Sequence, residues 1–269
     1  MKMKIKINVN ADDFGISKGV NSAVLEMFKA GKLNSASIIV NGNYFNEAIK
    51  IAKQNPNLKI GLHFNLTTGN SISGYGNLPL LTRKNGWFKN GFVAILFLIL
   101  FRKKSLLREV NLELAAQIKM LKHRGIKIDH INSHRHIHFL PGIFNLVTKI
   151  AAKYQIKDLR IINENFINSW KMGGSKSFLW NGGIIKWLLL RFLGMINGSA
   201  KIKSRIYFFS ILYSCNISKE LIAKLKIPDN FSSAEIMIHP GNPAIDMKSK
   251  GKLLEKSHLL SPNRYRENL

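Results

Sequence analysis

The sequence predicts an α/β protein built on parallel strands, arranged either as an open sheet or as a barrel. Strand and helix patterns alternate along the first 65 residues, which is typical of a parallel sheet. The length of 269 residues is enough for one (β/α) barrel. In addition, side chains capable of chemistry follow five of the expected strands, and the sites of parallel α/β proteins lie at that edge.

The amino-terminal elements follow from the spacing of apolar residues. Residues 5–9 alternate apolar and polar side chains and predict a strand that runs into the acidic pair Asp12 and Asp13. Ser17 is placed to cap a helix whose apolar stripe ends at Gly31. The next segments predict a strand at 36–40, a helix at 45–53 and a strand at 58–64.

The rest of the chain continues this pattern with longer interruptions. Residues 67–87 are rich in Gly, Asn and Ser and predict a long loop. Helices are expected at 106–123 and 144–154, and strands at 126–133, 159–162 and 235–238. The residues after Lys248 are polar and show no clear period.

Composition excludes a mainly disordered or fibrous chain, because 46% of the residues are hydrophobic and 21% are charged. The formal net charge of +26 is unusual. Such a surface attracts anions such as nucleic acid, anionic lipid or acidic glycans. A chain biased toward Lys, Asn and Ile has the same charge without any anionic partner, so both interpretations stay open.

Cysteine and hydropathy patterns favour the cytoplasm. The one cysteine, Cys215, cannot form an internal disulfide, which favours a reducing compartment. The first residues lack the continuous apolar stretch of a signal peptide. The longest apolar run, residues 92–101, is about half of the roughly 20 residues that a spanning helix needs.

The acidic pair and a histidine cluster indicate a metal site. Adjacent carboxylates at Asp12 and Asp13 repel, so one can bind a cation while the other acts as a base, although an acidic turn or helix cap has the same pattern. His134, His136 and His138 share one face if the chain is extended, and neutral imidazole is a common metal ligand. A polar surface strand is the alternative.

His63 and His239 are also candidate site residues, because each lies at the end of an equivalent strand. Pro240 and Gly241 mark a sharp turn that exposes the His239 imidazole. A mixed His and Asp set suits Mg, Mn, Zn or Fe(II) and does not single one out.

Four motifs in order resemble those of the YdjC-like carbohydrate deacetylases, which include the chitooligosaccharide deacetylases. These motifs are Asn10-Ala11-Asp12-Asp13-Phe14-Gly15, Gly61-Leu62-His63, Ser133-His134-Arg135-His136-Ile137-His138 and His239-Pro240-Gly241. The resemblance implies a single distorted (β/α) barrel with parallel strands across residues 1–269. Helical, apolar and basic insertions then fall near 88–105 and 170–205.

The resemblance also implies a metal-dependent hydrolase that removes an acetyl group from an N-acetylated sugar, either an oligosaccharide or a glycolipid. One divalent metal ion is expected, Mg²⁺ first by resemblance, with Zn²⁺ or another ion as the alternative. The implied ligands are Asp13, His63 and His134, the implied general base is Asp12 and the implied acid is His239. His136, His138 and Arg160 are expected to bind substrate or orient these groups, with Arg160 pairing with Asp12 to keep it ionised.

Two positions depart from the family pattern. Many relatives carry Asp where this chain has Asn132, and the segment after Arg160 lacks the Pro that relatives often show before Glu164. Asn132 and the apolar stretch after Gly91 are more similar to the branch associated with hopanoid lipid synthesis.

Other functions stay open from the residues alone. A metal-dependent phosphoesterase would use the same ligands and suit the positive charge. A basic membrane-surface or nucleic-acid-binding protein would leave the strand-end residues unexplained, so no nucleic acid is expected. The apolar stretches 92–101 and 184–196 are either core helices, a homodimer contact, or interfacial helices on the inner face of an anionic membrane.

Overall fold

The computed structural model describes residues 5–172, 182–202, 204–214, 217 and 219–248. Seven strands form one sheet in the order β5-β4-β3-β2-β1-β7-β6. Every neighbouring pair is parallel, which confirms the predicted α/β class. The strands are β1 (Lys6–Phe14), β2 (Ser35–Ile38), β3 (Lys59–Phe64), β4 (His130–Ser133), β5 (Asp158–Leu159), β6 (Ile206–Phe209) and β7 (Ser233–Ile238).

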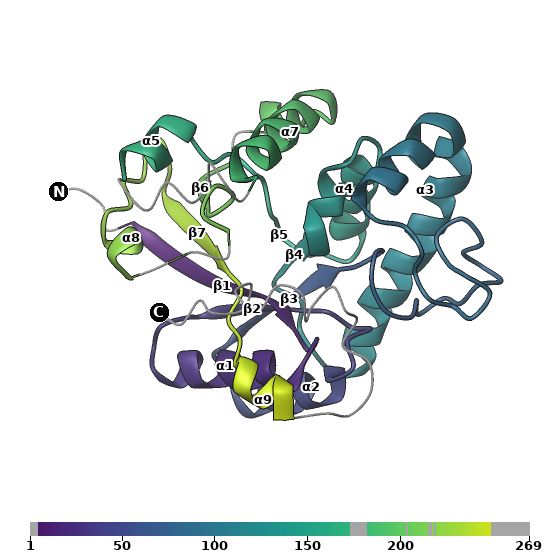
Figure 1. The fold of residues 1–269 in the computed structure, drawn as a ribbon, viewed down its shortest axis with the longest axis horizontal. Coiled ribbons are helices and arrows are strands. Elements are labelled where there is room, and N and C mark those ends of the chain that lie inside the picture. The colour runs from purple at the N-terminus through teal and green to yellow at the C-terminus, as the bar shows by residue number, and fades with distance from the viewer. Residues whose placement is uncertain (1–4, 173–181, 203, 215–216, 218, 249–269) are drawn as a thin grey trace.

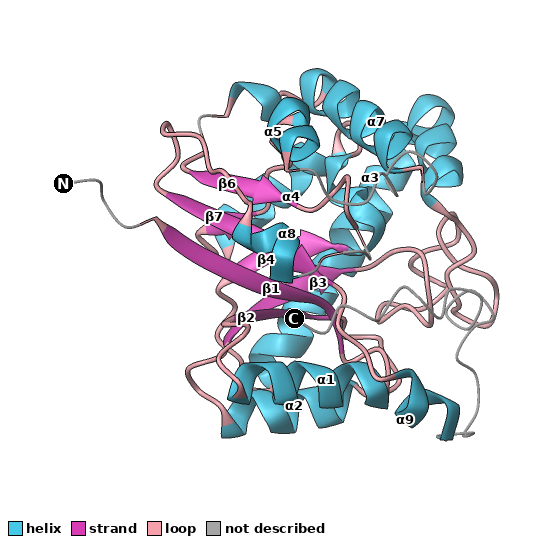
Figure 2. Cartoon of the chain, turned by 60° about the vertical axis from the view of Figure 1, so that its left-hand side comes forward, coloured by secondary structure: helices cyan, strands magenta, loops and turns pink. Residues whose placement is uncertain are grey.

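Helices cover the sheet on both sides. Figure 1 and Figure 2 show α1, α2 and α9 below the strands, with α7 and the upper part of α3 above them. The helices are α1 (Lys18–Lys29), α2 (Phe45–Gln54), α3 (Phe92–His123), α4 (Ile143–Lys153), α5 (Phe166–Lys171), α7 (Gly183–Ile196), α8 (Lys219–Ala223) and α9 (Pro243–Lys248), with 3₁₀ turns η1 (His134–Phe139) and η2 (Ser199–Lys201). Within the described residues, no helix is both long and apolar enough to cross a membrane.

The sheet curls into a distorted barrel that its edge strands do not close by pairing. Strands β5 and β6 are the two edges. The segment that follows β5 is instead joined to β6 by Asn163, because its Oδ1 accepts from Phe208 N at 2.7 Å and its Nδ2 donates to Ile206 O at 2.9 Å. An amide side chain therefore bridges the gap that a further strand pairing would otherwise close.

The sequence did not predict β6. Tyr207, Phe208 and Phe209 are all buried, so this strand has the continuous apolar pattern of a strand covered on both faces, without alternation. The predicted strands at 126–133 and 159–162 were too long, since only His130–Ser133 and Asp158–Leu159 pair with neighbours. Cys215 and the tail after Lys248 lie outside the described residues.

Helix α3 joins two segments that the sequence separated. It includes the apolar run 92–101 and the predicted helix 106–123, with a kink at Arg102, where φ is −137° and ψ is 27°. Its second part carries a buried polar stripe that includes Glu109 and Glu113. Glu113 accepts from Ile72 N and Ser73 N, both at 2.9 Å, so this helix anchors the predicted long loop.

Candidate active site and metal centre

The end of β1 brings two adjacent acids to one place. The pairing of β1 with β2 shifts register between Ala11 and Phe14, and Asp13 has a φ of 62°. Asp is one of the few side chains that adopt this left-handed conformation readily. The irregularity allows both Asp12 and Asp13 to approach His63, whereas a regular strand would direct them to opposite faces.

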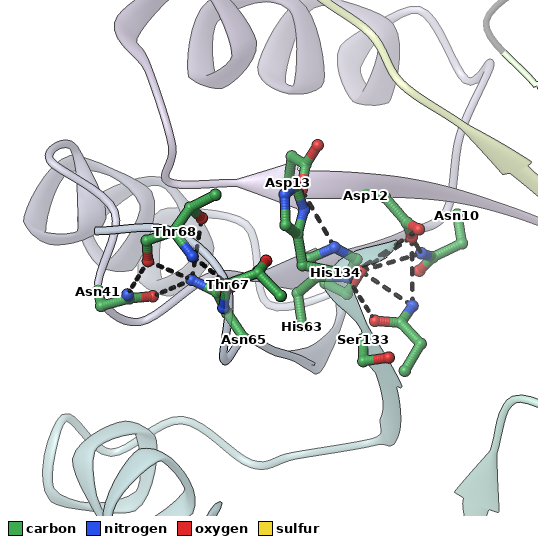
Figure 3. A network of polar contacts seen from close by, with 12 residues as sticks. Asn10, Asp12, Asp13, Asn41, His63, Asn65, Thr67, Thr68, Ser133 and His134 are labelled. Atoms are coloured by element: carbon green, nitrogen blue, oxygen red, sulfur yellow. Dashed lines mark hydrogen bonds and ion pairs between the residues drawn. The ribbon is translucent and has the colours of Figure 1, made fainter. Parts of the chain in front are cut away.

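Asp13, His63 and His134 form a buried cluster whose donor atoms all lie within 4.8 Å of one another. Asp13 Oδ1 lies 2.7 Å from His134 Nδ1 and 3.1 Å from His63 Nε2 (Figure 3). Asp13 Oδ2 is buried and has no hydrogen-bond partner among the described residues. One carboxylate and two imidazoles with an unused carboxylate oxygen form a donor set that fits a divalent cation.

His63 is oriented by Asn132 on the neighbouring strand β4. Its Nδ1 donates to Asn132 Oδ1 at 2.7 Å, so its Nε2 is the ring nitrogen that faces Asp13 Oδ1, at 3.1 Å. A metal ligand held through its other ring nitrogen is the usual arrangement in metalloproteins. Burial lowers the pKa of His63, but Asp12 and Asp13 outweigh this effect, so the pKa is raised above its ordinary value.

Asn132 also explains why Asp is not required at this position. Its Nδ2 donates to Asp12 Oδ1 at 3.2 Å and to Ser37 Oγ at 3.0 Å. The amide therefore supplies an acceptor to His63 and a donor to Asp12, whereas a carboxylate would place a further negative charge beside Asp12.

Arg160 pairs with Asp12, as the sequence predicted. Its Nη1 and Nη2 donate to Asp12 Oδ2 and Oδ1 at 2.7 and 2.8 Å, and its Nη2 also donates to Glu235 Oε1 at 2.7 Å. Burial raises the pKa of Asp12, but Arg160, together with His63 and His239, outweighs this effect, so the pKa lies well below its ordinary value. Asp12 is therefore ionised at neutral pH.

The two oxygens of Asp12 have different surroundings. Oδ1 accepts from Asn10 Nδ2 at 2.8 Å, Ser37 Oγ at 3.1 Å, Asn132 and Arg160. Oδ2 accepts a hydrogen bond from Arg160 alone among the described residues. Oδ2 is therefore the oxygen with lone-pair capacity for another donor.

Sequence reasoning missed four members of this site: Asn10, Ser37, Asn132 as a partner of Asp12, and Glu235. Each is a polar side chain on a buried strand. A polar residue within an otherwise apolar strand could have identified these members of the site from the sequence, because buried polar groups need partners.

The three clustered histidines do not share one face of an extended chain, so that expectation was wrong. Residues after β4 turn into η1, and Arg135 and His136 both have a φ of 55°. Only His134 of the three lies in the Asp13 cluster. Successive left-handed residues are costly, and such strain concentrates at functional sites.

His136 and His138 lie beside the cluster in different environments. His138 Nε2 donates to Arg160 O at 3.1 Å and its Nδ1 faces Ser133 Oγ, so it ties the end of β4 to the end of β5. Burial and the Arg160 charge lower the pKa of His138 to about 3. Burial, with Lys186 and Arg160, also holds the pKa of His136 well below its ordinary value.

The remaining predicted residue, His239, directly follows β7 and is buried, so the expectation that the turn exposes its imidazole was wrong. It lies near enough to Asp12 to help Arg160 and His63 lower the pKa of that carboxyl, against the opposite effect of burial. The predicted strand-end residues therefore meet at the carboxyl edge of the sheet, as expected for parallel strands.

The loop after His63 is fixed by a second polar network, visible at the left of Figure 3. Asn65 Oδ1 accepts from Thr67 N at 2.9 Å, and Asn65 Nδ2 donates to Asn41 Oδ1 at 2.9 Å and Thr68 O at 2.8 Å. This network holds the chain directly after β3, and with it the approach of His63 to the cluster.

The fold and the cluster define an α/β half-barrel protein with a potential metal centre at the carboxyl ends of its strands. The chain belongs to the YdjC-like protein family, whose sequence model matches residues 6–267. This match confirms the resemblance that the four motifs indicated.

Curated relatives cover part of the chain. A protein of Brevibacillus brevis named carbohydrate deacetylase is 37% identical over 152 residues, which is 56% of this chain and 58% of that protein. A Geobacillus stearothermophilus protein of the same name is 37% identical over 148 residues, 55% of this chain and 56% of that protein. The matched part thus spans little more than half the length of these relatives.

A solved structure supports the fold over the full length. A crystal structure from Enterococcus faecalis aligns with a TM-score of 0.68 and 22% identity, covering 98% of this chain and 97% of that one. At this identity the likeness concerns the fold alone.

Proposed function

We propose that this protein is a metal-dependent hydrolase that removes the acetyl group from an N-acetylated sugar and releases acetate. The observation that carries the proposal is the buried Asp13, His63 and His134 cluster with the ionised Asp12 beside it. Family membership and the names of the curated relatives support the sugar as substrate.

Asp13, His63 and His134 would hold the metal ion. When bound there, a divalent cation polarises a carbonyl oxygen and lowers the pKa of water. The family resemblance favours Mg²⁺, whereas imidazole donors also suit Zn²⁺. Asn132 keeps His63 in the tautomer that presents Nε2 to the site.

Asp12 is proposed as the general base. Its Oδ2 would take a proton from the attacking water as the water oxygen forms a bond to the acetyl carbon. Arg160 keeps Asp12 ionised and holds the carboxylate by two hydrogen bonds, so the base is correctly charged and oriented before substrate arrives.

His239 is proposed as the acid. As an imidazolium it would donate a proton to the sugar nitrogen while the bond from carbon to nitrogen breaks. The products are then acetate and a free amino sugar, and the atoms of the water that is consumed are divided between them. His136 is buried in the same region, where it would line the substrate site.

The test is acetate release from a panel of N-acetylated oligosaccharides and glycolipids, with chelator and with Mg²⁺ or Zn²⁺ added back. Acetate release that chelator abolishes and one metal restores is the expected result. Phosphate release from sugar phosphates without acetate release would instead favour a phosphoesterase.

A matched pair of histidine variants assigns the activity to this site. His134→Ala should lose metal binding and activity, whereas His123→Ala should keep both, because His123 is exposed at the end of α3. Full activity of His134→Ala in metal-free buffer would overturn the proposal.

A further inference from the structure

The first part of α3, residues 92–101, is apolar on two opposite faces. Val93, Phe97, Leu100 and Phe101 are exposed, and their i, i+4, i+7 and i+8 spacing places them on one side of the helix. Phe101 is 73% exposed. The other side of the same helix is already packed in the core through buried residues such as Ile95 and Ile99.

Helix α7 repeats this arrangement. Its inner side packs through Leu190 and Leu193, while its outer side exposes Ile185, Leu188, Leu189, Phe192, Met195 and Ile196. Ile185 is 73% exposed. Neither helix is therefore simply a core helix, which was one alternative that the sequence left open.

These exposed side chains are concentrated. Most of the large apolar side chains exposed in the described part of the chain lie on residues 92–101, α5 and α7. Single exposed apolar residues are ordinary, but a concentrated set marks an interaction surface. Figures 1 and 2 show α7 and the upper part of α3 on the side of the sheet opposite α1 and α2.

The exposed charged residues of these two apolar segments and of the turn that directly follows residues 92–101 are basic. The sequence contains no Asp or Glu between Glu47 and Glu109, or between Glu164 and Glu220. Arg102, Lys103 and Lys104 directly follow the apolar residues of α3 and are exposed, and Arg191 is exposed on α7. We name this surface the α3–α7 face. It comprises the exposed apolar side chains of residues 92–101 and α7 together with these basic residues.

The α3–α7 face adjoins the candidate site through η1. Gly91, just before α3, lies beside the Arg135 guanidinium, which is close to where a side chain at position 91 would begin. Asn197, which ends α7, donates from Nδ2 to Phe139 O at 2.6 Å. Residue 91, which precedes α3, and Asn197, which ends α7, thus lie beside the short segment that begins with His134.

We propose that the α3–α7 face docks on the surface of an anionic lipid bilayer. Exposed Phe, Leu and Ile side chains insert at the boundary between headgroups and acyl chains, and the basic residues bind anionic headgroups. Because η1 lies beside Gly91 and the end of α7, docking brings the candidate site close to the membrane surface. The proposal rests on exposure and charge, so it is independent of the reaction.

The test is co-sedimentation of the full chain with phosphatidylcholine vesicles, with and without phosphatidylglycerol. Binding should require phosphatidylglycerol and weaken as salt is raised, because salt screens the headgroup attraction. Phe97→Ser/Phe101→Ser and Leu188→Ser/Phe192→Ser should each weaken binding by at least about 10-fold, as expected when inserted apolar side chains are removed. Arg102→Gln/Lys104→Gln should also weaken vesicle binding, although this variant keeps every exposed apolar side chain.

The matched control is Leu112→Ser, which changes an exposed apolar residue of α3 beyond the kink and should bind as the unmodified chain does. Three results would overturn the proposal. They are no binding at low salt, equal binding by the serine variants and the control, and a stable dimer that the serine variants dissociate, since a second copy would then cover this face.

Discussion

Replacing Arg160 by Met is expected to lower the free energy of unfolding by about 3–5 kcal/mol at neutral pH. The guanidinium is buried and donates two hydrogen bonds to Asp12 and two to Glu235, at 2.7 to 2.9 Å. Methionine keeps an unbranched apolar chain but leaves two carboxylates without their cation. In a chain of this size, that loss corresponds to a decrease in Tm of roughly 6–20 °C.

The pH dependence identifies the cause. In the unmodified protein Arg160 depresses the pKa of Asp12. The stability that this pair contributes is therefore complete above the unfolded-state Asp pKa of about 3.9, and it is lost as pH falls through the pKa of Asp12 in the folded protein. In Arg160→Met the strongest effect that lowers the pKa of Asp12 is lost, while burial, which raises it, remains, so we expect this pKa to rise. The variant should therefore recover stability relative to the unmodified protein as pH falls from 7 toward 4.

The measurement is urea unfolding followed by circular dichroism at pH 7 and near pH 4.5. Arg83→Met, which changes an exposed arginine, should change stability little at either pH. A loss below about 1 kcal/mol at pH 7 would be ordinary for a surface change and would refute the reasoning. An equal loss at both pH values would assign the effect to packing, including the contact of Arg160 with the Phe208 ring at 5.1 Å.

Four further substitutions test the site and its support. Asp12→Asn should keep metal binding and abolish turnover, whereas Asp13→Asn should lose metal binding in calorimetric titration; the opposite pattern would exchange their roles. Asn132→Leu removes the acceptor that orients His63, so metal affinity should fall about 10- to 100-fold, and an unchanged affinity would contradict that orienting role. Glu113→Ala should speed hydrogen exchange at the backbone amides of residues 72 and 73 by at least about 10-fold, and unchanged protection would show that the carboxylate does not hold the loop.

Much of the fold could be predicted because its elements have clear local periods. The helices with one apolar stripe were found close to their observed bounds, whereas the alternating strand predicted at residues 5–9 continues to Phe14. Strand β6 was missed because both of its faces are buried, which removes the alternation that identifies a strand. The short pairing of β5 was overestimated because pairing depends on a neighbour, and here only Asp158 and Leu159 meet β4.

By itself, the sequence determined which strands end in chemically capable residues, and parallel pairing then requires those ends to meet at one edge. It also suggested the Arg160 and Asp12 pair, although the two residues lie at the ends of strands β5 and β1, which are not neighbours in the sheet and whose ends meet only because the sheet curls.

Only the tertiary structure decided the partners that lie across strands: Asn132 beside His63, Glu235 beside Arg160, and Ser37 beside Asp12. It also decided the left-handed turn at His136 and the exposure of both apolar helices. The physical reason is that a local pattern specifies the period of an element, whereas register and packing specify which side chain faces which.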